Sequence, residues 1–228
     1  MSDAHFDKIA DAYDESLPAH VVEHYLRKRT AFVRAHVAAG ASVLDVGCGT
    51  GALAVRIQQA GYQVTGVDSS AGMLRVLKER DSSVGAVGGS GTGLPFAEDH
   101  FDLVYCVAVM HHIAEAASVR QTLLEMVRVV KPGGLVLVWD HNPRNPYWRL
   151  LMARVPQDTG EERLIPEEEI LAGLRAAGAE LVGSQQLGFV PDFTPAKLLG
   201  LVARGERIVE RTPGLRRVCA HNVILATK

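Results

Sequence analysis

The chain has 228 residues, enough for one well-packed domain with additional lobes but too few for two domains of ordinary size. Its 24 basic and 26 acidic residues give a formal net charge of −2, which excludes a global electrostatic field for nucleic acid or an anionic membrane. The three cysteines lie far apart, and no apolar run is long enough to cross a bilayer, so we expect a cytoplasmic protein with reduced thiols and no integral membrane segment.

The first 40 residues differ from the rest of the chain because they predict two amphipathic helices and no strand. We expect this helical cap, residues 1–40, to lie over one edge of a sheet. From residue 42 onward, short apolar runs alternate with helical patterns, which is typical of βα units and a mostly parallel sheet. The predicted strands are residues 42–46, 63–68, 83–88, 101–106, 134–139, 179–187 and 218–226.

Helices are predicted between most of these strands. The pattern is clearest over 115–130, where apolar side chains share one face. It is also clear over 166–177, which opens with Pro166 and three glutamates as a helix start should. The fold class is therefore α/β, with a single domain over residues 1–228.

Two segments interrupt this alternation and are predicted to act as substrate lids. Residues 141–165 form a proline-punctuated insertion after the fifth strand, and residues 190–217 contain a basic amphipathic helix near 196–211 followed by a turn. The arginine face of that helix fits either a solvated lid or contact with an anionic or lipid-linked acceptor at a membrane surface. We expect the substrate pocket between these segments and the N-terminal helices.

The stretch VLDVGCGTG, residues 43–51, predicts a strand that runs into a glycine turn and opens a helix. Gly47, Gly49 and Ala52 satisfy the pattern G-x-G-x-x-A, which also admits a nicotinamide or flavin cofactor. Asp45, however, would repel a pyrophosphate and suits a ligand that carries an ammonium group. S-adenosylmethionine is such a ligand, because its methionyl tail is a zwitterion, its sulfonium is cationic and it contains no phosphate.

Four motifs, in order and with ordinary spacing, resemble those of the class I S-adenosylmethionine-dependent methyltransferases that act on small molecules. They are VLDVGCGTG at 43–51, VDSSAGML at 67–74, LPFAEDHFDLVYCVAVMHHI at 94–113 and VVKPGGLVLV at 129–138. The resemblance runs from about residue 5 to residue 140 and is weak beyond that point. It implies a Rossmann-like, doubly wound sheet with seven strands, six of them parallel and the last, 218–226, reversed.

The resemblance also assigns the cofactor residues. It implies that the methionyl part of S-adenosylmethionine is held by Asp45, Gly47, Gly49 and Gly51. It also implies that Asp68 binds the ribose hydroxyls and that Met73 packs near the adenine. Tyr13 matches a tyrosine that helps the N-terminal helix to close over the cofactor. Beside these positions, Ser69, Gly91 and Val107 are expected to complete the pocket.

Two of these assignments carry qualifications. Asp68 ends the second predicted strand, where either kind of nucleotide needs an acceptor for its ribose hydroxyls, so it does not discriminate between cofactors. Ser90 stands where relatives usually carry an acidic residue that accepts a hydrogen bond from the adenine amino group. A hydroxyl accepts less strongly than a carboxylate, so Ser90 predicts a somewhat lower cofactor affinity.

Catalytic candidates lie just after the fourth and fifth strands, because ligands of open α/β sheets bind beyond the carboxyl ends of the strands. Methyl transfer from a sulfonium is a direct displacement, so a base is needed only if the acceptor must lose a proton. His111 and His141 are candidate bases, with Asp140 or Asn142 orienting a ring or the substrate. The alternatives are structural: either histidine of the His111–His112 pair can pack in the core, and Asp140 can end a strand or cap a turn.

We therefore expect an enzyme that transfers a methyl group from S-adenosylmethionine to an oxygen, nitrogen or carbon of a small molecule. The alternatives are an NAD(P)-dependent oxidoreductase, a protein that binds S-adenosylmethionine without transfer, and an enzyme that uses it for another reaction. No nucleic-acid partner is expected, since the motif of base-methylating relatives is absent from the sequence. No metal site is expected, because His20 and His24, four residues apart, have no evident third ligand. A homodimer is left open.

Overall fold

The computed structural model describes residues 3–151 and 162–228, so part of the predicted insertion, residues 152–161, lies outside the described residues. Within the described part, seven strands form one sheet in the order β3-β2-β1-β4-β5-β7-β6. Their bounds are β1 Ser42–Val46, β2 Gln63–Asp68, β3 Gly85–Gly88, β4 Phe101–Val107, β5 Val130–His141, β6 Glu180–Leu187 and β7 His221–Thr227. Only β7 pairs antiparallel with its neighbours, β5 and β6, which confirms the predicted sheet.

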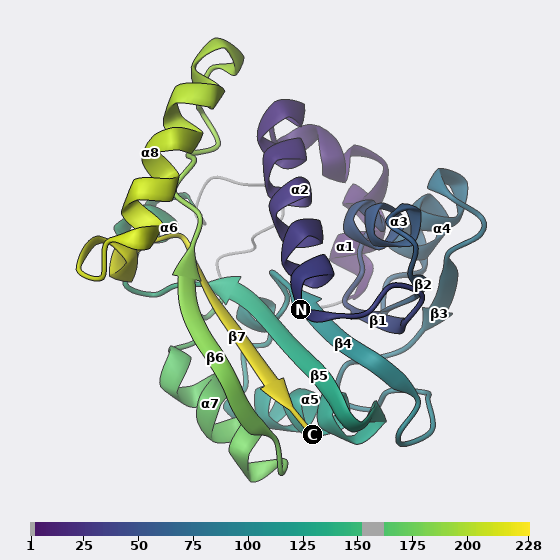
Figure 1. Ribbon diagram of the computed structural model, residues 1–228. Coiled ribbons are helices and arrows are strands. Elements are labelled where there is room, and N and C mark those ends of the chain that lie inside the picture. The colour runs from purple at the N-terminus through teal and green to yellow at the C-terminus, as the bar shows by residue number, and fades with distance from the viewer. Residues whose placement is uncertain (1–2, 152–161) are drawn as a thin grey trace.

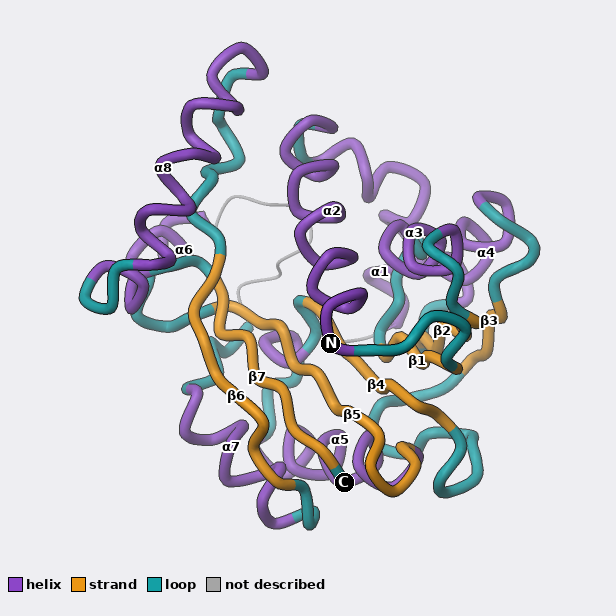
Figure 2. Tube along the Cα trace, in the orientation of Figure 1, coloured by secondary structure: helices purple, strands orange, loops and turns teal. Residues whose placement is uncertain are grey.

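Helices cover both faces of the sheet (Figures 1 and 2), which is why the central strands β1 and β4 carry runs of consecutive buried residues rather than alternating buried and exposed ones. One face packs against α2 (Ala19–His36), α3 (Ala52–Gln59) and α4 (Ala71–Arg80). The other packs against α5 (Ala116–Val129) and α7 (Glu167–Ala176). Each helix buries the apolar stripe that its 3.6-residue period predicts, as in α5 with Val119, Leu123 and Met126.

The N-terminal helices differ from the predicted edge cap. They comprise α1 (Asp3–Ile9), the 3₁₀ helix η1 (Ala10–Ser16) and α2. Phe32 of α2 packs edge-on against Trp139 of β5, with 5.7 Å between ring centroids. This helix therefore lies across a face of the sheet rather than over its edge, because its large apolar side chains find the buried surface of β5 there.

The remaining elements gather beyond the carboxyl ends of the parallel strands. They are η2 (Met110–His112), α6 (Pro146–Leu151), η3 (Ala196–Leu198), α8 (Leu199–Arg211) and η4 (Leu215–Val218). In Figure 1, α8 extends away from the body at the end to which the arrows of β5 and β6 point. Across residues 3–151 and 162–228, no helix combines the length and the apolar character needed to cross a membrane.

Candidate active site

A cavity of about 590 Å³ opens beyond the carboxyl ends of β1, β4 and β5. The predicted site residues that line it are Tyr13, Asp45, Gly47, Gly49, Val107, His111 and His141. The predicted residues outside its lining are Gly51, Asp68, Ser69, Met73, Ser90, Gly91 and Asp140. The structure thus gathers around one cavity most of the residues predicted for the methionyl tail and the chemistry, with Gly51 and Asp140 as exceptions. Those predicted for the nucleoside follow β2 and β3 outside it.

The outer walls of the cavity come from three parts of the chain. The N-terminal helices contribute Tyr25 and Arg29, and the start of the insertion contributes residues 145–148. The third wall comes from residues 189–193 and from residues near the start of β7, including His221. Residues 189–193 precede α8 in the chain, and the residues near the start of β7 follow it. The predicted lid segment 190–217 therefore borders the cavity through the loop before α8, and no residue of α8 itself lines the cavity.

The glycines of the turn between β1 and α3 have different roles. Gly51 has a φ of 75°, and a Cβ there would stand 2.0 Å from the Leu77 side chain, so this glycine lets α3 pack close to α4. Gly49 has a φ of 53°, and a Cβ there would meet no atom within 4 Å. Because Gly49 also lines the cavity, its backbone is open to an approaching ligand.

Asp45 lies at the end of β1 with only 3 % of its surface exposed. The Tyr105 hydroxyl donates a 2.8 Å hydrogen bond to its Oδ2. Burial raises the pKa of Asp45 to about 7, the Tyr105 hydrogen bond opposes this rise, and the nearby charge of Asp68 adds to it. A cation bound beside this carboxylate would favour its ionised form, so the site is poised to bind a positive group.

Arg29 of α2 is a cavity residue that the sequence analysis missed. Its guanidinium lies over the rings of Tyr25 and Trp139, at 5.6 and 5.8 Å from their centroids. Within the described residues its Nε is buried without a hydrogen-bond partner. Burial lowers the pKa of Arg29, while the charge of Asp45 raises it, so the two side chains present opposite charges to the same cavity.

Asp68 ties the end of β2 to the glycine turn. Its Oδ2 accepts a 2.8 Å hydrogen bond from the Gly49 N–H, and its Oδ1 accepts one of 2.9 Å from the Ser70 N–H. A carboxylate oxygen can accept more than one hydrogen bond, so these contacts are compatible with the predicted ribose role. They also mean that Asp68 shapes the turn itself.

The residues predicted for the adenine end are less open. Met73 is 1 % exposed, and its N–H is capped by the Ser70 side chain at the start of α4. The Ser90 hydroxyl lies 2.9 Å from that of Thr92 in an exposed turn. The structure places both residues near the ends of β2 and β3, and their contact with adenine stays a prediction.

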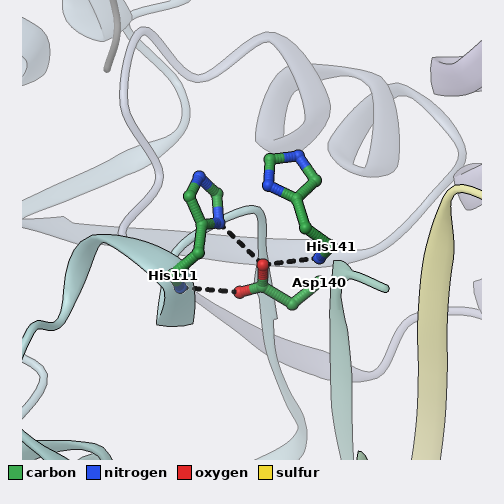
Figure 3. A group of neighbouring side chains, drawn as sticks. All are labelled: His111, Asp140 and His141. Carbon is green, nitrogen blue, oxygen red and sulfur yellow. Dashed lines mark hydrogen bonds and ion pairs between the residues drawn. The ribbon is translucent and has the colours of Figure 1, made fainter. Parts of the chain in front are cut away.

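Asp140 and His111 form a buried pair at the floor of the cavity (Figure 3). The Asp140 carboxylate lies 2.7 Å from His111 Nδ1 and also accepts hydrogen bonds from the backbone N–H groups of Met110, at 2.5 Å, and His141, at 2.6 Å. Burial raises the pKa of Asp140, but the charge and the hydrogen bond of His111, together with the backbone hydrogen bond from His141, outweigh this effect, so the pKa of Asp140 lies below its ordinary value. The ionised carboxylate can only accept, so His111 carries its proton on Nδ1, and Nε2 is the basic nitrogen.

His141 belongs to an aromatic wall formed by His111, His141, Trp148 and His221. The His141 ring lies 3.9 Å from that of His111 and 3.6 Å from that of Trp148, measured between centroids. Burial lowers the pKa of His141 well below its ordinary value and that of His221 to about 3. Both imidazoles are therefore neutral near pH 7 and present flat, uncharged surfaces to the cavity.

Other candidates from the sequence prove to hold the structure together. Asn142 donates from Nδ2 to the carbonyls of Arg217 and Cys219, at 2.9 and 2.8 Å, so it fastens the segment before β7 and does not orient a catalytic ring. His20 Nε2 donates to the carbonyl of Thr194 at 2.7 Å. His24 lies 2.8 Å from Glu206 of α8. This pair of histidines joins α2 to the lid region.

His111, Asp140 and His141 also come close enough to hold a metal ion, since one ligand atom from each lies within 4.8 Å of the others. The two oxygens of Asp140 already accept hydrogen bonds from buried donors. A metal that displaced these hydrogen bonds would leave buried donors unsatisfied, at a cost of about 1–3 kcal/mol for each. The arrangement favours a hydrogen-bonded pair over a metal centre.

Comparisons with known proteins fit this geometry. A family described as "Methyltransferase domain" matches residues 44–138. The demethylmenaquinone methyltransferase of Paenarthrobacter aurescens is 36 % identical over 148 residues, which cover 64 % of this chain and 57 % of that protein. The protein of the same name from Corynebacterium urealyticum is 31 % identical over 205 residues, covering 80 % of this chain and 86 % of that one.

The chain belongs to the class I S-adenosylmethionine-dependent methyltransferases. A Thermotoga maritima S-adenosylmethionine-dependent methyltransferase of known structure shares the fold, with a TM-score of 0.72, 21 % identity and 99 % of both chains covered. The alignment with the Paenarthrobacter relative spans less than two thirds of that protein's length. Family membership confirms the recognition made from the four motifs and decides against the nicotinamide-dependent alternative.

The methyltransferase cavity fits the methyl donor of its family. The tail of S-adenosylmethionine carries an ammonium and a carboxylate, and the cavity offers Asp45 and Arg29. The Nε of Arg29, which has no hydrogen-bond partner among residues 3–151 and 162–228, is a donor that a carboxylate would satisfy. Arg29 was missed because VVEHYLRKRTAF contains three adjacent basic residues, and nothing in the sequence alone says which one points inward.

Proposed function

We propose that this methyltransferase transfers a methyl group from S-adenosylmethionine to a ring carbon of a planar, hydroxylated aromatic molecule of the quinol type. Two relatives named demethylmenaquinone methyltransferase support the class of acceptor. The aromatic wall beside the cavity supports it independently, because flat neutral rings favour stacking with a flat substrate. The observation that carries the proposal is the 2.7 Å contact between Asp140 and His111 at the cavity floor.

Bound S-adenosylmethionine would supply an electrophilic methyl group on its sulfonium. Asp45, Gly47 and Gly49 would hold its ammonium end, with Arg29 on its carboxylate and Tyr13 and Val107 closing the cavity around them. Asp68 and Ser69 would hold the ribose, and Met73, Ser90 and Gly91 would lie at the adenine end. In this arrangement the acceptor would bind on the side of the cavity that His111 lines.

His111 is the proposed base. A hydroxylated ring becomes a strong carbon nucleophile when its hydroxyl loses a proton, and His111 Nε2 is the basic nitrogen that can take that proton. The ring carbon would form its bond to the methyl group as the methyl–sulfur bond breaks. That carbon would then lose its hydrogen as a proton, and the ring oxygen would regain a proton from His111, so that one proton is released overall. Asp140 fixes the tautomer of His111 and compensates the positive charge that the ring gains. His141 is too poor a base for this step, because burial lowers its pKa well below the ordinary value. We assign it to stacking against the acceptor.

Cofactor binding is tested by titration calorimetry with S-adenosylhomocysteine, the product of the reaction. Asp68→Asn keeps an oxygen for one of the two backbone hydrogen bonds and loses the other. It also removes the charge that strengthens ribose hydrogen bonds, so we expect an affinity about tenfold to a hundredfold lower. The matched control, Asp81→Asn, changes a partly exposed aspartate at the far end of α4, where asparagine keeps an oxygen for the hydrogen bonds from Ser83, and should bind like the native protein. Unchanged affinity in Asp68→Asn would remove the ribose assignment.

Catalysis is tested with labelled S-adenosylmethionine and a demethylated naphthoquinol that lacks the lipid tail. His111→Gln should lower kcat by about a hundredfold to ten-thousandfold, since a positioned general base contributes that much, and should leave the affinity for S-adenosylhomocysteine within about twofold. His100→Gln, at an exposed position, is the matched control. Native turnover in His111→Gln would show that no base acts at this position. Transfer to amines but not to the naphthoquinol would contradict the acceptor class.

A further inference from the structure

The segment from η3 to η4 exposes an unusual number of apolar side chains. On α8 itself, Leu201 and Ile208 have 67 % and 66 % of their surface exposed. They lie seven residues apart and so share one side of the helix. The exposed apolar residues that flank them at either end are Leu198, Leu215 and Val218. Large apolar residues that stand exposed together on one side of a helix mark a surface that contacts something apolar.

The acidic residues of the same segment face the body of the protein, and its basic residues face outward. Its two acidic residues, Glu206 and Glu210, turn inward, where Lys28 of α2 forms an ion pair with each. Glu206 is 2 % exposed, and its other oxygen accepts the Phe189 N–H at 2.8 Å. The basic residues of the segment are all exposed: Lys197, Arg204, Arg207, Arg211, Arg216 and Arg217. The outward face is therefore purely cationic although the whole chain carries −2.

The apolar and basic residues occupy neighbouring stripes of α8. Arg204, Arg207 and Arg211 follow a spacing of three and four, which places them on one side of the helix beside the stripe of Leu201 and Ile208. We call these two stripes together the α8 face. A helix with an apolar stripe bordered by arginines has the composition of one that lies in the plane of a membrane interface.

The α8 face adjoins the mouth of the cavity. Phe189 and Phe193, which precede α8 and are 44 % and 73 % exposed, line the cavity, as does Val218 at the end of η4. Phe193 also packs edge-on against Tyr147 of the insertion at 6.1 Å. A surface bound by α8 would therefore lie beside the entrance through which an acceptor reaches the aromatic wall.

We propose that the α8 face docks the protein on the surface of an anionic lipid bilayer. The observations favour a bilayer over a protein partner because α8 projects from the body as a convex rod (Figure 1), whereas the apolar core of a protein interface is depleted in charge and complementary in shape. Thirteen residues span only about 20 Å, too short to cross a bilayer but suited to lie along it. The arginines would sit among anionic headgroups while Leu201 and Ile208 enter the acyl boundary.

This docking gives the proposed function a more specific acceptor. If the reaction is the proposed methylation of a quinol, docking favours an acceptor with a lipid tail, whose ring enters the cavity past Phe193 while its tail stays in the bilayer. The docking itself does not depend on that reaction, so the two can fail separately.

Vesicle sedimentation of the full chain tests the docking. The vesicles are phosphatidylcholine alone or phosphatidylcholine with about 30 % phosphatidylglycerol, because each basic residue near an anionic surface contributes about 1 kcal/mol. We expect clear binding to the anionic vesicles only. Arg204→Gln/Arg207→Gln should weaken it about 20- to 30-fold on the same scale, and Leu201→Ser/Ile208→Ser at least about tenfold through lost apolar burial.

Matched controls change exposed residues of the same types elsewhere. Leu124→Ser/Val182→Ser removes two exposed apolar side chains from α5 and β6, and Arg34→Gln/Arg175→Gln removes two exposed charges from α2 and α7. Both should bind vesicles like the native protein, and thermal unfolding checks that all variants fold.

Several results would overturn the docking. They are no binding to anionic vesicles, equal loss in the control variants, and a native dimer that Leu201→Ser/Ile208→Ser dissociates while vesicles are not bound. The last would assign the α8 face to contact between two copies of the chain.

Turnover separates this proposal from the proposed function. If both hold, Leu201→Ser/Ile208→Ser should use a tail-less naphthoquinol at the native rate and lose at least about tenfold in turnover of a lipid-tailed one in anionic vesicles. Turnover of neither acceptor by the native protein, with vesicle binding intact, would refute the quinol reaction alone. Native turnover of the lipid-tailed acceptor by the variant would refute the role of the α8 face.

Discussion

The carboxylate of Asp45 predicts a specific pH dependence of cofactor binding. Its pKa is about 7 because it is buried, so near pH 7 about half of the molecules carry the negative charge that an ammonium group needs. At pH 5.5 only about 3 % are ionised, so the affinity for S-adenosylhomocysteine should fall about fifteenfold between pH 7.0 and 5.5. The histidines His112 and His221 have pKa values near 3 and do not titrate in this range.

Calorimetry measures both the affinity and the protons exchanged. Because a bound ammonium stabilises the ionised carboxylate, binding at pH 7 should release about half a proton, detected as a heat that depends on the ionisation enthalpy of the buffer. Asp45→Asn should bind more weakly at pH 7 and show no fall toward pH 5.5. A flat affinity in the native protein, or the same slope in Asp45→Asn, would refute the assignment of Asp45 to the ammonium group.

Three further predictions concern the same turn. Tyr105→Phe removes a hydrogen bond that holds the pKa of Asp45 down, so calorimetry should show the affinity beginning to fall at a higher pH. Asp45→Asn should raise the Tm, and it should do so more at pH 8 than at pH 4. The pKa of Asp45 is higher in the folded state than in the unfolded state, so ionisation of Asp45 destabilises the fold as the pH rises from about 4 to 7. A smaller gain in Tm at pH 8 than at pH 4 would contradict the raised pKa. Gly51→Ala should cost about 2–4 kcal/mol of unfolding free energy by denaturation, because a Cβ would press on Leu77, while Gly49→Ala should cost about 1 kcal/mol and mainly weaken cofactor binding; equal losses would refute the distinction.

The sheet and the glycine turn could be predicted because their signals are local. Short apolar runs that alternate with helical patterns predict the strands, and the turn between β1 and α3 is determined by the nine consecutive residues 43–51. The same is true of Asp140, which follows the predicted strand 134–139 and lies in the last two residues of β5, at the carboxyl edge of the sheet. Its partner His111 follows the neighbouring strand, so the pair could be anticipated from the order of strands alone.

What the sequence could not supply are the contacts made by distant segments. His221 pairs with His141 because β7 runs antiparallel to β5, so that the beginning of one strand meets the end of the other. Arg29 enters the cavity because α2 crosses the face of the sheet, which depends on how Phe32 packs against Trp139. The roles of His20 and His24 depend likewise on the lid region, more than 170 residues away in the chain. Periodicity within a helix carries no information about such partners.

The opposed charges of Arg29 and Asp45 link cofactor binding to the closure of the site. Each is desolvated, as the downward shift in the pKa of Arg29 and the upward shift in that of Asp45 indicate, so burying each charge costs free energy. A zwitterion placed between them compensates both at once. Arg29 belongs to α2 and Asp45 to β1, so the same ligand ties the N-terminal helices to the sheet. In addition, α2 holds α8 through the ion pair of Lys28 and Glu206. We therefore expect S-adenosylmethionine to bind before the acceptor and to make the aromatic wall more rigid before the acceptor ring stacks against it.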